Sequence, residues 1–180
     1  MALRCRYVLD RCVGRSDAGN MDLMSTYTAT IRWSRKGGEF MRGQYSRGHE
    51  WAFDGGAVVP ASASPDNVPP GTADEAGVDP EEAFIAALSS CHMLFFLDFA
   101  RRAGFVVDSY VDEADGILEK RSDGKIAMTR VTLRPRVTWG GDAPDEAVVA
   151  DLHHRAHEAC FIANSVTTEV KVEPFSPLPL

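Results

Sequence analysis

The chain has 180 residues, enough for one domain with a substantial hydrophobic core, or for a domain and a tail. Hydrophobic residues make up 44% and charged residues 25%, which is ordinary for a soluble globular protein. The net charge of −7 argues against a nucleic-acid partner, because such a partner selects a basic surface. No apolar run reaches the length that a bilayer requires, and the first residues lack the apolar core of a secretory signal, so we expect a cytoplasmic protein. Four cysteines are too few for a secreted disulfide scaffold.

The first part of the chain predicts an extension followed by an antiparallel meander. Residues 1–24 show no steady period, and we expect a disordered or upstream-start extension that includes Cys5 and Cys12. Alternation of apolar and polar residues, together with turns at glycine pairs, predicts three short strands. These strands are expected at residues 27–33, 39–45 and 51–53.

A long helix is predicted over residues 79–104, after a proline-rich loop over residues 60–78. Asp79 is a good N-cap, and Pro80 suits the first helical position because its missing N–H would be unpaired there anyway. Acidic residues in the first turn and arginines in the last turn both favour the helix dipole. The interior is apolar on nearly every side, which indicates a helix buried in a core.

After this helix, the pattern predicts further strands and a second helix. We expect a strand with a possible second segment over residues 106–119, a hairpin turn at 122–124 and a strand over 131–139. Pro135 cannot donate a ladder hydrogen bond, so that last strand should lie at an edge or carry a bulge.

A second helix is predicted to start after Asp142 as its cap and to run to about Ala163, with a final strand over residues 166–172. The order of elements predicts an α+β fold, with helices packed on antiparallel sheet and residues 25–180 forming a single domain.

One thiol lies on the apolar stripe of the central helix, where Phe84, Leu88, Cys91 and Phe95 follow helical spacing. A free cysteine is often an inert, buried side chain, but a second thiol, Cys160, on the other predicted helix favours redox chemistry. A reactive thiol must be a thiolate, which needs nearby positive charge or hydrogen bonding. Cys91 lies too far from the helix start to use the dipole, so a cation would have to come from elsewhere in the chain.

Arg47, in the loop Tyr45-Ser-Arg-Gly-His49, is the candidate for that cation, and Glu81 could hold it in place. From spacing alone, a solvated loop arginine is the simpler interpretation. Cys160 is expected at the far end of its helix, where the dipole disfavours a thiolate. It is therefore better suited to resolve an oxidised Cys91 than to attack first.

The histidines offer a different chemistry. His153 and His157 are four residues apart on one predicted helical face and could bind a metal ion. No third convincing ligand follows, and His92 lies on the other helix, so we favour a solvated histidine face and expect no metal. Ser90 and His92 flank Cys91 but cannot act as its base, because neighbours on a helix point in different directions.

Three segments carry a resemblance to the OsmC/Ohr family. The stretch Pro-Glu-Glu-Ala-Phe-Ile-Ala-Ala-Leu-Ser-Ser-Cys-His-Met at residues 80–93 resembles the hallmark helix of that family. The stretch Ala-His-Glu-Ala-Cys at residues 156–160 resembles its second-cysteine helix, and residues 45–56 are similar to its N-terminal meander. The similarity runs over about residues 27–172, nearly the whole predicted domain.

The resemblance implies an intertwined homodimer of α+β subunits, whose sheets wrap around the paired central helices. It also implies a thiol peroxidase that reduces organic hydroperoxides without metal or flavin. Cys91 would attack the O–O bond and become a sulfenic acid, Cys160 would condense with it to a disulfide, and an external dithiol would restore both thiols. Glu81 matches the family's acidic residue that orients an active-site arginine, and Arg47 would be that arginine.

Apolar walls such as Phe95 and Phe96 would suit an alkyl hydroperoxide better than hydrogen peroxide. One departure from the family pattern stands out: many members place proline directly after the second cysteine, whereas this chain has Phe161. Two alternatives stay open, a non-enzymatic OsmC-like ligand-binding or redox-sensing stress protein and, more weakly, a metal-dependent enzyme that uses the histidine face.

Overall fold

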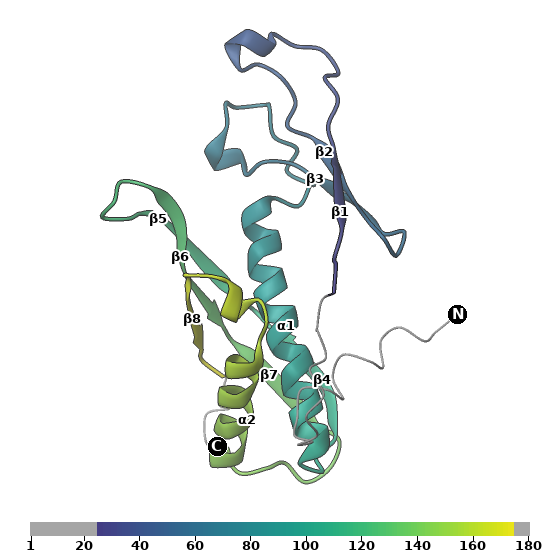
Figure 1. The fold of residues 1–180 in the computed structure, drawn as a ribbon, viewed down its shortest axis with the longest axis vertical. Coiled ribbons are helices and arrows are strands. Elements are labelled where there is room, and N and C mark those ends of the chain that lie inside the picture. Colours follow the sequence, from purple (N-terminus) through teal and green to yellow (C-terminus); the bar gives the residue numbers. More distant parts are fainter. Residues whose placement is uncertain (1–24, 175–180) are drawn as a thin grey trace.

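The structure is a computed structural model that describes residues 25–174. The predicted extension over residues 1–24, with Cys5 and Cys12, lies outside the described residues. The helices and strands are, in chain order, β1 (Ala29–Arg32), β2 (His49–Phe53), β3 (Val58–Ala61), α1 (Pro80–Arg102), β4 (Val107–Asp112), β5 (Asp115–Lys120), β6 (Ile126–Leu133), β7 (Pro135–Trp139), α2 (Glu146–Ala159) and β8 (Glu169–Val172). Figure 1 shows an upper lobe that holds β1–β3, a lower body that holds β4–β8 and α2, and α1 running from one to the other.

The upper lobe is an antiparallel meander of three strands, as expected, but only the first and third predicted strands are present. β2 pairs with β1 on one side and β3 on the other. The strand predicted over residues 39–45 is wrong: Phe40–Arg42 forms a short 3-10 helix, closed by a single bridge between Glu39 and Gln44. The reason is local, because Gly38 and Gly43 both adopt positive φ, at 81° and 74°, and fold the chain into a tight loop. The third strand is β3, which begins before the predicted proline-rich loop.

The central helix begins and ends close to where the sequence predicts. The Glu82 amide donates to Asp79 Oδ1 at 2.8 Å, and the Asp79 amide donates to Glu82 Oε2 at 3.1 Å, which makes a reciprocal capping box. At the other end, Gly104 adopts a φ of 88° just beyond the helix. Contrary to the sequence expectation, α1 is long and apolar enough to cross a membrane by length and composition alone, a property that core helices of soluble proteins share.

The lower body contains two sheets instead of one. β4 pairs with β7, while β6 lies between β5 and β8. The β6–β8 pairing is parallel, which the sequence did not predict. The single strand predicted over residues 131–139 is two strands, since the chain changes sheet between Leu133 and Pro135. Pro135 has no N–H for a ladder, and the Arg134 amide donates to Asp112 Oδ1 at 2.6 Å instead of to a neighbouring strand.

The second helix starts later than predicted. Asp145, not Asp142, is its N-cap and accepts a hydrogen bond from the Val148 amide at 2.8 Å. The helix also ends earlier, at Ala159, so Cys160 is the first residue outside it.

Two apolar clusters anchor α1 to the lower body. The larger joins α1 to α2 through Phe95, Phe96, Phe99, Ala100, Leu152, Ala156 and Cys160, and the smaller joins α1 to β6 through Leu88, Val131 and Leu133. The fold class is therefore α+β, as predicted. Cys91 packs against the larger cluster, so the core that holds the helices together also brings the two thiols to one place.

Candidate active site

The turn after α2 positions Cys160. Cys160 has an extended conformation (φ −65°, ψ 112°) and is 1% exposed. Its carbonyl accepts from the Asn164 amide at 3.0 Å, and its Sγ accepts from the Ala163 amide at 3.4 Å. These two bonds fold the chain back over the sulfur, so residues 161–163 form a tight turn beside α1.

Cys91 and Cys160 meet between the two helices as free thiols. The Cys160 thiol donates a hydrogen bond to the Cys91 sulfur, and this bond is the main reason that the pKa of Cys91 falls from 9.0 to about 6. Burial opposes the shift, while the backbone N–H groups of Ile162 and Phe161 reinforce it. The same hydrogen bond, followed by burial, raises the pKa of Cys160. The two shifts thus favour Cys91 as the thiolate and Cys160 as the thiol that keeps its proton.

Activation of Cys91 comes from a different source than the sequence suggests. From the sequence we expect a cation near Cys91, whereas the structure supplies a neighbouring thiol and two backbone amides. The amide of Phe161 is available only because this position is not proline, which has no N–H. The spacing of residues in the sequence could not reveal these donors, because the turn that follows α2 brings the two amides next to Cys91 only in the folded chain.

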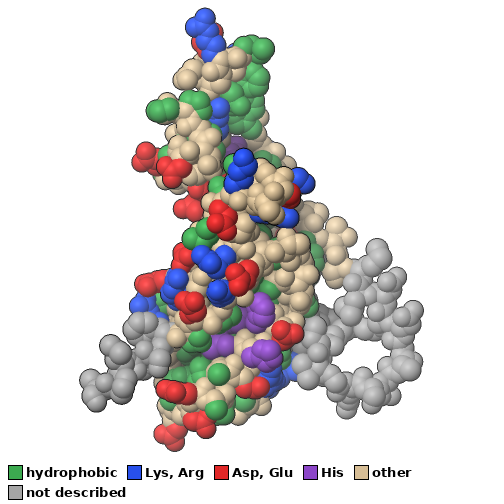
Figure 2. All heavy atoms as spheres, turned by 90° about the vertical axis from the view of Figure 1, so that its left-hand side faces the viewer, with side chains coloured by type: hydrophobic (Ala, Val, Ile, Leu, Met, Phe, Trp, Pro, Cys, Tyr) green, Lys and Arg blue, Asp and Glu red, His purple; other side chains and the backbone are tan. Residues whose placement is uncertain are grey.

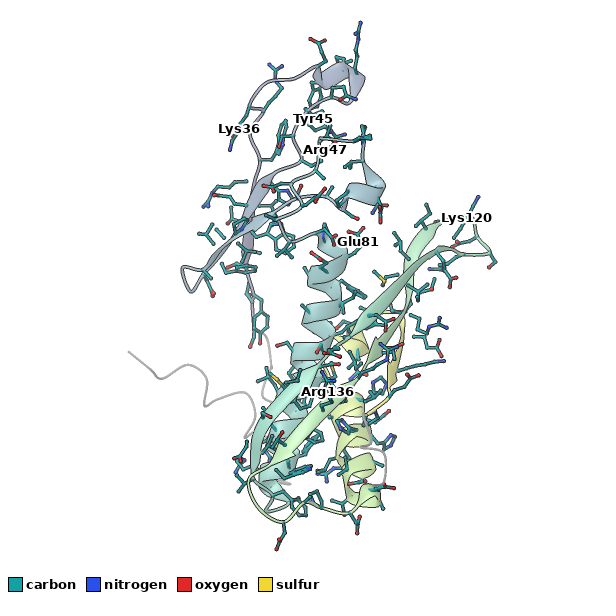
Figure 3. The ribbon with its side chains drawn as sticks, turned by 180° about the vertical axis from the view of Figure 1, so that it is seen from behind. Lys36, Tyr45, Arg47, Glu81, Lys120 and Arg136 are labelled. Carbon is teal, nitrogen blue, oxygen red and sulfur yellow. The ribbon has the colours of Figure 1, made fainter. Side chains whose placement is uncertain are left out.

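Arg47 and Glu81 do not meet Cys91 within one chain. Arg47 lies in the upper lobe, where its Nη1 donates to the Gly43 carbonyl at 2.6 Å and the Tyr45 carbonyl at 2.5 Å. Its guanidinium also lies 3.8 Å from the centre of the Tyr45 ring. Figure 3 shows Arg47 above Glu81, which lies on the first turn of α1. Cys91 follows Glu81 by ten residues, or about 15 Å of helix.

The two phenylalanines predicted to line a substrate pocket have different surroundings. Phe96 is fully buried and packs on Tyr110, Trp139 and His153, so it is part of the core. Phe95 packs edge-on against Phe161, with ring centres 5.0 Å apart. Phe161 is 47% exposed and directly follows Cys160, so its ring offers an apolar surface on the same turn as that thiol.

The expected solvated histidine face is wrong for His153. His153 is 3% exposed and its Nδ1 lies 3.0 Å from Nε2 of His92, which is 1% exposed. Burial lowers the pKa of His92 to about 3 and that of His153 to about 4, and positive charge on neighbouring histidines contributes at His92. Near pH 7 both imidazole rings are therefore uncharged. The inference that His92 cannot serve Cys91 as a base agrees with this geometry, because His92 points to α2.

The structure thus has a small α+β scaffold in which two thiols meet between the main helices. A family model described as OsmC-like protein matches residues 71–174. The chain belongs to the OsmC-like protein family.

Among solved structures, an OsmC-like protein of unknown function from Vibrio cholerae is 53% identical over 84% of this chain and 100% of its own, with a TM-score of 0.81. The organic hydroperoxide resistance protein OhrB of Bacillus subtilis is 23% identical over 83% of this chain and 98% of its own, with a TM-score of 0.59. An organic hydroperoxide resistance protein from Elizabethkingia anophelis is 17% identical over 86% of this chain and 96% of its own, with a TM-score of 0.63. The latter two similarities concern the fold. No curated protein matches the sequence.

Proposed function

We propose that the protein is a cysteine-based thiol peroxidase that reduces organic hydroperoxides to alcohols in stress defence. The observation that carries the proposal is the hydrogen bond from Cys160 to Cys91, which lowers the pKa of Cys91. A thiolate is the nucleophile in such a reaction, and a second thiol in contact with it would resolve the oxidised product. Two relatives of the same fold are named organic hydroperoxide resistance proteins.

In the proposed reaction, the Cys91 thiolate attacks the terminal oxygen of the hydroperoxide, and the O–O bond breaks. The alkoxide leaves and takes a proton to become the alcohol, while Cys91 becomes a sulfenic acid. Cys160 then attacks the sulfenic sulfur, so that an S–S bond forms and water leaves. An external dithiol reduces this disulfide by exchange and restores both thiols.

We propose that Arg47 and Glu81 act at this site from a second copy of the chain. The upper lobe exposes large apolar side chains, including Ile31 at 59% and Val58 at 56%, and Leu94 of α1 is 51% exposed. Such surfaces favour association with another subunit. An apolar cavity of about 470 Å³ lies beside Arg47 and is lined by aromatic rings that include Trp33 and Tyr45.

In that homodimer, the cavity would hold the alkyl group, and the guanidinium would stabilise both the thiolate and the developing oxygen charge. Phe95, with Phe161, would cover the apolar side of the reacting thiol. We expect the protein to work in the cytoplasm, where a dithiol reductant keeps the pair reduced.

The test is stopped-flow oxidation with an alkyl hydroperoxide, compared among the parent, Cys91→Ser and Cys160→Ser. We expect Cys91→Ser to abolish rapid peroxide consumption, and Cys160→Ser to consume one equivalent and stop at a sulfenic acid that a dimedone-type reagent traps. An unchanged rate in Cys91→Ser would refute the catalytic role and favour the non-enzymatic, ligand-binding or redox-sensing alternative.

A further inference from the structure

A line of histidine nitrogens leads from the contact between α1 and α2 to a hollow beside β8. His92 Nε2 and His153 Nδ1 lie 3.0 Å apart, and the two rings are almost parallel, at 7°. The second nitrogen of His153, Nε2, is buried and has no hydrogen-bond partner among the described residues. The same is true of Nδ1 of His157, one helical turn further along α2.

The hollow has a volume of about 300 Å³ and is lined by histidines of α2 and by Val170 and Val172 of β8. His153, His154 and His157 are the α2 residues that supply these rings. Figure 2 shows histidine side chains gathered on this side of the lower body. An unpaired polar atom removed from water costs about 1–3 kcal/mol, so a ligand in the hollow that pairs with both nitrogens would remove this cost.

We propose that His153 Nε2 and His157 Nδ1 together bind a divalent transition-metal ion of the zinc or nickel type. Residues four apart on a helix lie on the same face, which lets two imidazoles reach one ion. When His153 donates its Nδ1–H to His92, its Nε2 lone pair is free for the metal. A partner on the second nitrogen is a regular feature of metal-binding histidines, because it fixes the tautomer and the orientation of the ring.

The donor set selects the class of ion. Imidazole nitrogen suits zinc, nickel and copper, whereas magnesium and calcium require oxygen ligands, and among residues 25–174 no carboxylate lines the hollow. The described residues contain no group of three or more histidine, cysteine or acidic side chains placed around one ion. The proposed site therefore has two protein ligands within the described part of the chain, and water would fill the remaining positions. It does not involve the Cys91–Cys160 pair.

The test is a calorimetric titration of the full-length reduced protein with Ni²⁺, compared with His157→Gln and His154→Gln. His157 is the better position to change, because its ring is half-buried and replacement of the buried His153 would disturb the helix contact. We expect one equivalent of Ni²⁺ to bind the parent, and His157→Gln to weaken binding by at least about tenfold. His154→Gln, the matched control, should bind within about twofold of the parent, because His154 has no buried unpaired nitrogen.

A Co²⁺ absorption spectrum provides the second measurement. Ligation by imidazole should give ligand-field bands without the thiolate charge-transfer band that cysteine ligation would add. Three results would overturn the proposal: no saturable binding to the parent, equal affinity in His157→Gln, or a thiolate band that accounts for the bound metal.

Discussion

The Cys160 thiol donates its hydrogen bond to the sulfur of Cys91, and the two pKa values move in opposite directions as a result. The opposite shifts favour the negative charge on Cys91 and the proton on Cys160. The hydrogen bond also connects the end of α2 to the middle of α1. Changes to either the donor or the turn that holds it should therefore alter the reactivity of Cys91.

Removing the thiol donor should make Cys91 a weaker acid. In Cys160→Ala, we expect the pKa of Cys91 to rise from about 6 toward 9.0, because the largest stabilising contact is lost. At pH 7 the thiolate would then be the minor form. The measurement is the pH dependence of alkylation by iodoacetamide, with the Cys91 peptide quantified by mass spectrometry. Cys160→Ser is the control, since its hydroxyl can still donate, and it should shift the midpoint less than Cys160→Ala does.

Proline at position 161 should also reduce the acidity of Cys91. Phe161→Pro removes one amide donor to the thiolate, and we expect the Cys91 pKa to rise by about one unit, as loss of a hydrogen bond to a charged group implies. The ψ of 112° at Cys160 lies close to the range that a residue before proline prefers, so the turn should tolerate the change.

Phe161→Ala separates the amide from the ring. This variant keeps the N–H and should leave the alkylation midpoint near that of the parent. It removes the ring that packs on Phe95, so any effect should appear in KM for bulky alkyl hydroperoxides. Equal midpoints in the proline and alanine variants would contradict the role of the amide.

A mixed dimer tests whether Arg47 serves a second copy. We expect Arg47→Ala and Cys91→Ser each to be nearly inactive alone. Coexpressed at equal levels, they should recover about a quarter of the parent activity, because half of the dimers would carry one complete site of two. The activity of each separately purified homodimer is the control. No recovery in purified mixed dimers would argue against a site shared between chains.

The buried histidine pair predicts a loss of stability in acid. The pKa values of His92 and His153 are lower in the folded protein, at about 3 and 4, than the ordinary value of 6.5. The unfolded chain therefore binds protons first as pH falls. The stabilising effect is complete above about pH 6.5 and decreases below it, by about 2 kcal/mol for each histidine between pH 7 and pH 5.

Urea unfolding at the two pH values measures this loss, and the double variant His92→Leu/His153→Leu is the comparison. Replacing both partners by apolar groups removes the two buried imidazoles of the pair, so the part of the acid-dependent free energy of unfolding that they contribute should disappear. If the double variant loses as much stability as the parent, other groups are responsible.

The cap of the central helix gives a further prediction for stability. Asp79→Ala removes the acceptor for the Glu82 amide and should lower the free energy of unfolding by about 1 kcal/mol. Asp79→Ser keeps an acceptor at this position and should recover most of that loss. Chemical denaturation at neutral pH measures both, and equal losses in the two variants would show that the cap is not the cause.

The sequence by itself determined the features that depend on near neighbours in the chain. Helix α1, its cap at Asp79 and the position of Cys91 on its apolar stripe follow from residues within a few turns of one another, because helix formation and capping are local. Pro135 likewise indicated a break in a strand, since a missing donor has the same consequence in any sheet. The sequence also predicts the second helix, but with Asp142 as its N-cap, whereas Asp145 caps it in the structure.

Only the tertiary structure decided what each chemically active group touches. Burial of His153 against His92 and the contact between Cys160 and Cys91 depend on how α2 packs on α1, and that packing joins residues about sixty to seventy positions apart. The thiol activation for which Arg47 was only a candidate comes instead, within one chain, from Cys160 and two amides in a turn. Hydrogen bonds act over about 3 Å, so their partners are fixed only when the helices have docked.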